Sequence, residues 1–304
     1  MQTAEIKTAL LLEKLILFYD KSRLDKERET SMFYKMREFV KEIGKYAFDA
    51  MQQKHKINYK EDNDAILSIV TDVDLHNSKA FEQFAKENFA DLNYVIIDEE
   101  SIDDLDGSLF QQIANTEYQF ILDPIDGTLN YSSGLPFYGI LLSVFKNGEP
   151  LYGFICAPAL DELVYTDGKQ VYREHFGKTE ILNKFPKGVS RVVQAHMWEV
   201  KLKPNHINGR FIAQDYFSAA IYSLYLSLGQ LRAVLATAKL WDIAPLMLIC
   251  KIYGMGIYDY DTKEEITISP KYISEKGKIK NMMIMGFKDE IDEIKNIFSE
   301  IVRV

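Results

Sequence analysis

Residues 118–128 read YQFILDPIDGT, and this stretch sets both the fold and the site that we expect. The apolar run from Tyr118 to Leu122 predicts a buried strand, and two aspartates follow it directly. Pro124 fixes its own φ angle and holds Asp123 extended, so the loop is stiff. Because ligand sites in layered α/β proteins lie beyond the carboxyl ends of strands, we expect a site in this loop.

The loop contains oxygen atoms that could bind a metal ion and N–H groups that could bind an anion. Asp123 and Asp126 can project toward one point together with the carbonyl of Ile125, and hard oxygen ligands of this kind suit Mg²⁺. Gly127 permits close approach of the backbone, and with Thr128 it can present N–H groups to an anion at a helix start. An ordinary Asp-Pro turn followed by a helix cap is the alternative, since a DPxD sequence alone is common in turns.

Other carboxylates also follow apolar runs. Asp74 comes shortly after IVT, Glu99 after YVII, and Asp242 after Trp241. Each has an ordinary explanation, because Asp74 and Asp242 are suited to capping helices and Glu99 lies in the acidic run 98–106, which could be a solvated loop. Their combination with the DPIDGT loop is what favours a functional site.

The flanking sequence predicts α+β structure followed by α/β structure, in layers of sheet and helix. In the first half, Asn147-Gly148 and Asp167-Gly168 mark hairpin turns. In the second half, strand-like and helical runs alternate. Expected strands are 66–70, 94–97, 118–122, 138–145, 150–157, 191–195, 209–213, 231–236 and 282–287, and expected helices are 74–90, 217–228, 242–253 and 289–302.

The amino-terminal region predicts helices that serve packing. Residues 3–19 have helical spacing, residues 20–29 indicate a solvated connector or a charged helix end, and Thr30 and Ser31 are candidate N-caps of a second helix. We therefore expect a helical extension over 1–30, an α+β subdomain with most metal ligands over 31–185, and an α/β subdomain with Asp242 over 186–304.

Composition narrows the class of protein. The 304 residues suit one large or two medium domains, and a net charge of −9 argues against nucleic acid or an anionic membrane as the main partner. A phosphorylated substrate is compatible with that charge only if the site contains positive charge. The two cysteines, Cys156 and Cys250, lack a CxxC spacing, and neither a signal peptide nor a membrane-spanning run is evident, so we expect a soluble, cytoplasmic protein with buried thiols.

Four motifs in order resemble the inositol monophosphatase family of Mg²⁺-dependent, lithium-sensitive phosphatases. They are VTDVD at 70–74, EES at 99–101, DPIDGTLNY at 123–131 and WDIA at 241–244, and the hairpin sequence at 134–158 also resembles that family. The resemblance extends from about residue 32 to the carboxyl terminus. It implies an αβαβα sandwich of the sugar phosphatase type, a homodimer, and hydrolysis of a small phosphorylated polyol, sugar or nucleotide.

The resemblance also implies roles for individual residues. Asp74, Glu99 and Thr128 would steer an attacking water, and two or three Mg²⁺ ions, with Mn²⁺ as a substitute, would activate it and neutralise the leaving oxygen. Lys60 lies where many members have a lysine. The implied metal ligands are Glu99, Asp123, the Ile125 carbonyl, Asp126 and Asp242; the implied phosphate cradle is Gly127 and Thr128; and Ser218 and Ala219 would lie beside the substrate.

Two departures from the family bear on the substrate. Asp98 replaces the usual glycine before the two glutamates, and Leu235 and Ala236 stand where a glutamate binds the inositol hydroxyls. Losing that acceptor should weaken discrimination between polyols. Inositol monophosphate or a related sugar or polyol phosphate is therefore our first expectation.

Other functions remain as alternatives. A phosphoadenosine phosphate phosphatase or a fructose bisphosphate phosphatase belongs to the same superfamily, but nucleotide members tend to carry Lys-Glu-Phe after DPxDGT, where this chain has Leu129-Asn130-Tyr131. A catalytically silent family member is the alternative outside enzymes. The intact set of acidic residues and Thr128 argues against it.

Overall fold

A computed structural model describes residues 2–53, 57–59, 69–182, 190–196, 200–202 and 211–301. The chain divides into two compact units, residues 1–39 and residues 40–304. Helix α1 (Gln2–Met51) is continuous across the boundary. Both large sheets and all the candidate site residues belong to the second unit.

The amino-terminal helix differs from what the sequence led us to expect. Residues 20–29 are helical rather than a connector, consistent with the high helix propensity of their Lys, Arg, Glu and Leu residues. The Thr30 hydroxyl donates to the Lys26 carbonyl at 2.8 Å, one turn back along the same helix. The predicted N-cap at Thr30 or Ser31 is therefore wrong, because both residues lie inside α1.

The larger sheet has seven strands in chain order, and β3 and β4 are its only parallel pair. Its hairpins confirm the predicted turns: Asn147 and Gly148 have φ angles of 52° and 79°, and Gly168 has a φ of 86°. The strands are β3 (Tyr94–Asp98), β4 (Tyr118–Asp126), β5 (Gly139–Lys146), β6 (Glu149–Ala157), β7 (Glu162–Thr166), β8 (Val171–His175) and β9 (Lys178–Ile181).

The smaller sheet has five strands in the order β12-β10-β13-β15-β14. The first three are parallel, as expected where strands alternate with helices, and β15 is antiparallel to both of its neighbours. Its strands are β10 (Val192–Ala195), β12 (Ile212–Gln214), β13 (Ala233–Ala236), β14 (Gly256–Asp259) and β15 (Met283–Gly286).

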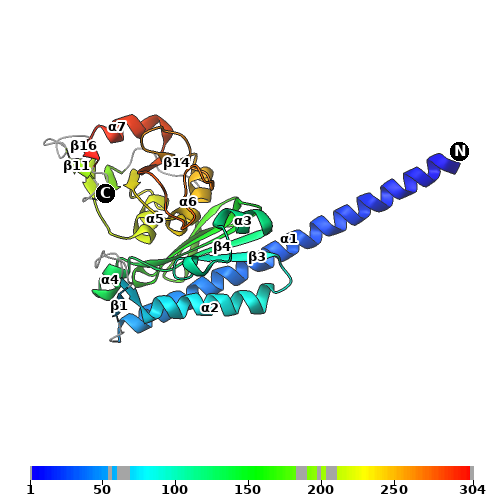
Figure 1. Cartoon of the computed structure of the whole chain (residues 1–304), viewed down its shortest axis with the longest axis horizontal. Helices are drawn as coiled ribbons and strands as arrows, with labels where there is room; N and C mark the ends of the chain where they lie inside the picture. The colour runs from blue at the N-terminus through cyan, green and yellow to red at the C-terminus, as the bar shows by residue number, and fades with distance from the viewer. Residues whose placement is uncertain are drawn as a thin grey trace. The chain divides into compact units, whose positions relative to one another are not determined.

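Helices and sheets alternate in five layers, which confirms the expected sandwich. Helices α5 (Ala219–Ser227) and α6 (Leu240–Tyr253) pack between the two sheets (Figure 1). Helix α2 (Asp72–Phe89) packs on β4 from the outer face, where Phe81 and Phe120 meet edge to face with ring centroids 6.1 Å apart. Ile121, the next residue of β4, belongs instead to the core between the sheets, as strand alternation requires.

The carboxyl-terminal segment corrects a second expectation. The helix predicted for 289–302 is short, since α7 covers only Ile291–Lys295, and strand β16 (Phe298–Ile301) follows it and pairs antiparallel with β11 (Val200–Leu202). The outer face of the smaller sheet packs against α7 through Ile291 and Ile294.

The remaining elements are short. They are β1 (Ile57–Tyr59) paired with β2 (Ile69–Thr71), α3 (Leu109–Asn115), α4 (Thr128–Ser132), and the 3₁₀ turns Ile102–Asp104, Pro158–Leu160 and Lys288–Glu290. Parts of the expected strands 66–70 and 209–213, and the expected subdomain boundary at 185, lie outside the described residues. Cys156 and Cys250 are buried and unbridged. Over the described ranges, no helix is both long enough and apolar enough to cross a membrane.

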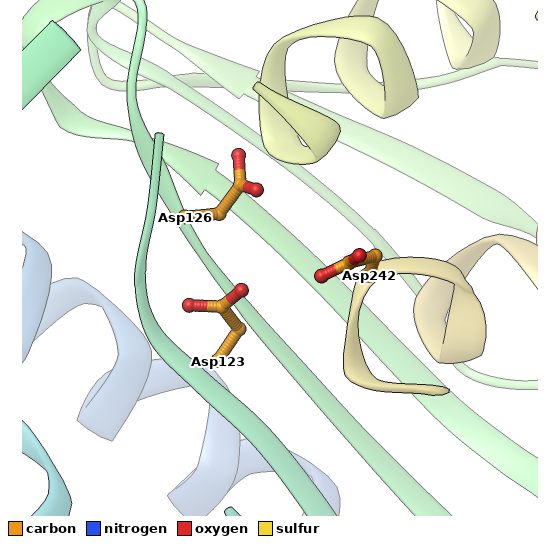
Figure 2. A group of neighbouring side chains, drawn as sticks. All are labelled: Asp123, Asp126 and Asp242. Carbon is orange, nitrogen blue, oxygen red and sulfur yellow. The ribbon is translucent and has the colours of Figure 1, made fainter. Parts of the chain in front are cut away.

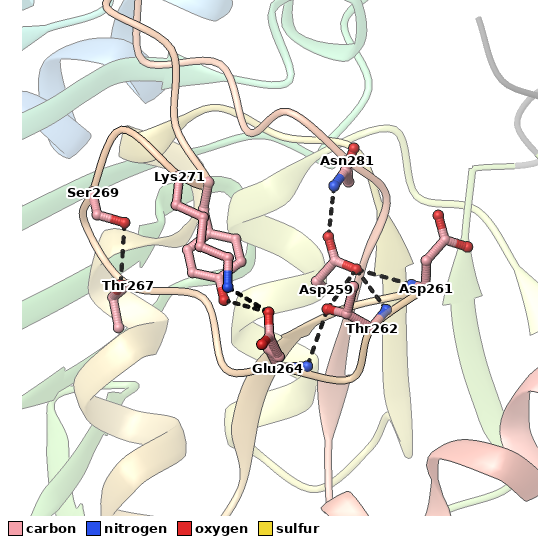
Figure 3. A network of polar contacts seen from close by, with 9 residues as sticks. Asp259, Asp261, Thr262, Glu264, Thr267, Ser269, Lys271 and Asn281 are labelled. Atoms are coloured by element: carbon pink, nitrogen blue, oxygen red, sulfur yellow. Dashed lines mark hydrogen bonds and ion pairs between the residues drawn. The ribbon is translucent and has the colours of Figure 1, made fainter.

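A buried carboxylate organises the turn after β14. Asp259, only 1% exposed, accepts hydrogen bonds from Asp261 N at 3.0 Å, Thr262 N at 2.8 Å, Thr262 Oγ1 at 3.0 Å and Asn281 Nδ2 at 2.7 Å (Figure 3). Burial alone would raise its pKa, but these hydrogen bonds lower the pKa below the ordinary aspartate value. The strand end is thus closed by a fully bonded, ionised side chain.

Candidate active site

Two aspartates at the end of β4 point toward the same place because the strand is irregular there. Residues three apart on a regular strand face opposite sides of the sheet. Between Asp123, paired with Leu141, and Asp126, paired with Gly139, β4 contains one residue more than β5. This bulge at the Pro124–Ile125 step turns both carboxylates toward one side, as Figure 2 shows.

The third aspartate of the cluster comes from helix α6. Asp242 lies in its first turn, and its Oδ2 accepts a hydrogen bond from the backbone N–H of Lys239 at 2.7 Å. One carboxylate oxygen from each of Asp123, Asp126 and Asp242 lies within 4.8 Å of the others (Figure 2). Residues 119 positions apart in the chain thus meet where the larger sheet faces α6.

Burial and mutual repulsion disfavour ionisation of these three carboxylates. Burial raises the pKa of Asp123 well above its ordinary value, and the charges of Glu99, Asp126 and Asp242 raise it further. Burial also raises the pKa of Asp242 to about 7 and that of Asp126 to about 6, although hydrogen bonds to Asp126 oppose the increase. Asp123 Oδ1 is buried and has no hydrogen-bond partner. The protein atoms alone therefore leave the cluster short of positive charge.

Asp126 is held in place by the start of helix α5. Its Oδ2 accepts hydrogen bonds from Ala220 N at 2.7 Å and from the Ser218 hydroxyl, which also caps α5 through Ile221 N. Gly127, with a φ of 76°, fits the narrow space beside them, because a Cβ there would lie 2.9 Å from the Phe137 carbonyl oxygen. The orientation of Asp126 thus depends on close contact between β4 and α5.

Glu99 lines the same cleft but has a cationic partner. The Lys239 ammonium nitrogen lies 2.7 Å from Glu99 Oε1. Asp98, the departure noted in the sequence, shapes the turn that carries Glu99, since its Oδ1 accepts hydrogen bonds from Glu100 N at 2.8 Å and from Ser78 Oγ at 3.1 Å. Sequence reasoning missed Lys239, although the need for positive charge in an acidic site was a signal to look for a lysine beside the WDIA motif.

Asp74 and Thr128 occupy positions next to the cluster. Asp74 is 1% exposed, and its Oδ2 accepts hydrogen bonds from the backbone N–H and hydroxyl of Thr71 in a capping box at the start of α2. Burial raises the pKa of Asp74 to about 7. The Thr128 hydroxyl donates to the Ile125 carbonyl at 3.0 Å, at the start of the short helix α4.

A cleft of about 190 Å³ brings most of the expected residues together. Asp74, Ser218 and Ala219 are not part of its lining, and their exposed fractions are 1%, 3% and 6%. Contact of Ser218 and Ala219 with a substrate stays a prediction, and Lys60 lies outside the described residues. The lining consists of Glu99, Asp123, Ile125, Asp126, Gly127, Thr128, Leu129, Phe217, Lys239 and Asp242.

Comparison with protein families supports the resemblance that the motifs carry. The profile of the inositol monophosphatase family matches residues 29–290. A protein of Thermotoga maritima described as fructose-1,6-bisphosphatase/inositol-1-monophosphatase is 26% identical over 79% of this chain and 90% of its own length. A protein of Methanocaldococcus jannaschii with the same description is 28% identical over 61% of this chain and 71% of its own length.

Solved structures share the fold. An IMPase/NADP phosphatase crystallised with Mg²⁺ and phosphate superposes with a TM-score of 0.67 and 16% identity, covering 90% of this chain and 98% of the other. At 16% identity, the superposition establishes only that the two proteins share the same fold. The chemistry of the site is argued from the residues of this chain.

Proposed function

The chain belongs to the inositol monophosphatase family, and on that premise we propose that it is a Mg²⁺-dependent phosphomonoesterase acting on a small polyol or sugar phosphate. The observation that carries the proposal is the convergence of Asp123, Asp126 and Asp242 within 4.8 Å, with Asp123 Oδ1 buried and unpartnered. Buried carboxylates this close destabilise a fold unless a cation compensates them.

The donor set suits a hard divalent cation. All the side chains of the cluster offer carboxylate oxygens, Ile125 lines the same cleft, and neither cysteine nor histidine is among its described lining residues. Oxygen-only donors favour Mg²⁺ or Mn²⁺ over zinc. We propose that two or three ions are held by Glu99, Asp123, the Ile125 carbonyl, Asp126 and Asp242, and that they supply positive charge to acidify water and to neutralise the leaving oxygen.

The residues around the cluster would position the other reactants. We assign Asp74 and Thr128, with Glu99, to orienting the attacking water, because the charges of Asp74 and Glu99 both act on Asp123 and Thr128 lines the cleft. We assign the backbone N–H groups of Gly127 and Thr128, where α4 begins, to binding phosphate oxygens. An N–H group bonds an anionic oxygen without needing a charged side chain.

A sugar or polyol phosphate is favoured over a nucleotide. Both relatives described above are named as bisphosphatase and monophosphatase together, which supports a site that accepts more than one small phosphate ester. Leu235 and Ala236 are both buried in β13, so they offer no hydroxyl acceptor at the position of the family's glutamate. Fructose 1,6-bisphosphate is therefore our second candidate substrate after inositol monophosphate.

Phosphate release from a panel of esters tests the function. We expect release from inositol 1-phosphate or fructose 1,6-bisphosphate with Mg²⁺, inhibition by lithium, and no release in EDTA. Asp123→Asn should lose most of this release, and its matched control is Asp103→Asn, since Asp103 is an exposed acid that pairs with Lys276 at the surface. No release from any ester in the panel would contradict the proposal.

We also propose a homodimer, as the family resemblance implies, and a location in the cytoplasm. Light scattering of the purified protein tests the first part, and fractionation of cells tests the second. A monomer at micromolar concentration would overturn the dimer.

A further inference from the structure

Lys239 brings a positive charge into the acidic cleft. Among the described residues that line the cleft it is the only cation, facing Glu99, Asp123, Asp126 and Asp242. Its ammonium nitrogen lies 2.7 Å from Glu99 Oε1 and 5.2 Å from the centre of the Trp241 ring. The cleft therefore contains a lysine ammonium group that is paired with Glu99, a carboxylate that we have assigned to metal binding.

If a divalent cation bound Glu99 while the ion pair persisted, two positive groups, the cation and the Lys239 ammonium, would contact the same carboxylate. Glu99 is only 18% exposed, so its charge is poorly screened by water and a cationic partner stabilises it. A divalent ion at the same carboxylate would repel the ammonium at close range. Either cation alone can therefore neutralise the charge of Glu99, but binding of both to the same carboxylate is unfavourable.

We propose that Lys239 is the counter-ion of Glu99 while the cleft contains no divalent cation, and that a divalent cation displaces its ammonium from that carboxylate. The inference rests on the proposed function, because the metal role of Glu99 is part of it. Lys239 is a positioning residue in this account: it holds the Glu99 side chain in place before metal binding, and it reduces metal affinity by competing for the same carboxylate.

The geometry allows the exchange without a change in the backbone. The Lys239 side chain is 46% exposed, so its ammonium can swing into solvent. Its backbone N–H stays bonded to Asp242 Oδ2 at 2.7 Å, and α6 begins at the next residue, Leu240. Removing the ammonium group should therefore leave the cluster in place.

Titration of the purified, metal-free protein with Mn²⁺, without substrate, tests the competition. The variant Lys239→Met keeps a stem of similar length and removes the charge, and we expect it to bind Mn²⁺ about fivefold more tightly, as expected for one partly exposed ion pair. Lys239→Arg retains the charge and should bind close to wild type. In EDTA, Lys239→Met should unfold at a lower temperature than wild type.

The matched control is Lys271→Met, which removes one positive charge from an exposed pair with Glu264, and neither of these residues lines the cleft. Its Mn²⁺ affinity should equal that of wild type. Equal affinities of Lys239→Met and Lys271→Met, or weaker binding by Lys239→Met, would overturn the inference while leaving the phosphatase proposal intact. A wild-type protein that binds no Mn²⁺ would overturn both.

Discussion

The aspartates of the cleft and Asp259 at the end of β14 are both withdrawn from water, yet their surroundings differ. Asp259 accepts four hydrogen bonds, and its pKa is lowered. Asp123 has an unpartnered Oδ1 and other carboxylates as neighbours, and its pKa is raised. Burial is common to both, so the difference comes from what the fold supplies around the oxygens.

The contrast distinguishes Asp259, whose carboxylate is hydrogen-bonded by the protein itself, from Asp123, whose carboxylate we propose to bind a metal ion. A turn that surrounds a carboxylate with N–H and hydroxyl donors gains stability from the protein alone. A cluster of close carboxylates in which Asp123 Oδ1 has no donor is unfavourable in the metal-free fold and should become favourable with a divalent ion. A substitution at Asp123 should therefore reduce activity without reducing the stability of the metal-free fold, and a substitution at Asp259 should reduce stability without changing metal binding.

The largest expected effect is the loss of catalysis in Asp123→Asn. Metal ions in such a site contribute several kcal/mol to the transition state, so we expect phosphate release to fall by at least about 100-fold. In EDTA the variant should unfold at the same temperature as wild type or higher, because one buried charge has been removed. An active Asp123→Asn, or one that unfolds earlier in EDTA, would remove the contrast with Asp259.

Asp259→Asn should show the reverse pattern. The substitution places an amide N–H₂ beside Asn281 Nδ2 and weakens bonds to a charged acceptor, so we expect a loss of about 1.5–3 kcal/mol in unfolding free energy. Denaturant unfolding gives that loss, and a Mn²⁺ titration should match wild type. If metal affinity fell with stability, the two regions would be coupled rather than distinct.

The pH dependence of stability should follow the raised pKa values of the cleft. A carboxyl whose pKa is higher in the folded state contributes stability that is complete below the unfolded value of about 4, and this stability is lost as pH rises through about 6 to 7 for Asp126 and Asp242. Metal-free protein should therefore have a lower Tm at pH 8 than at pH 5. Saturating Mg²⁺ should remove that decline, and a decline of equal size with Mg²⁺ would count against the cluster as its source.

A smaller effect is expected at the support of Asp126. Ser218→Ala removes the hydroxyl donor and leaves the bond from Ala220 N, so we expect Mn²⁺ affinity to weaken about tenfold. Ser269→Ala, at a partly exposed serine whose hydroxyl faces Thr267, provides the control. Unchanged affinity in Ser218→Ala would show that close packing alone orients Asp126.

Local chemistry explains which features could be predicted. The strand before Asp123, the Asn147-Gly148 hairpin and the oxygen-rich DPIDGT loop depend on neighbouring residues, so short windows of sequence contain them. The segment 289–302 has the periodicity of a helix, but its end pairs with β11 about a hundred residues earlier, and no local pattern contains that partner. The candidate N-caps at Thr30 and Ser31 were misleading because the charged residues before them continue the helix.

The acidic residues of the cleft could be predicted from the sequence, and the balance of charge within the cleft could not. Glu99, Asp123, Asp126 and Asp242 were identified by motif, and the bulge in β4 that aligns two of them was not. Lys239 is unremarkable in the sequence, and its importance depends on a contact across 140 residues with Glu99. Such pairings are set by how α6 meets the turn after β3.

The most direct test of the account is a diffraction experiment on crystals grown with MnCl₂ and measured at the manganese absorption edge. We predict an anomalous peak among the carboxylate oxygens of Asp123, Asp126 and Asp242, and no peak at Asp259. The absence of a peak in the cluster at saturating Mn²⁺, with the three side chains in the positions described, would contradict the central claim that this cluster exists to bind divalent cations.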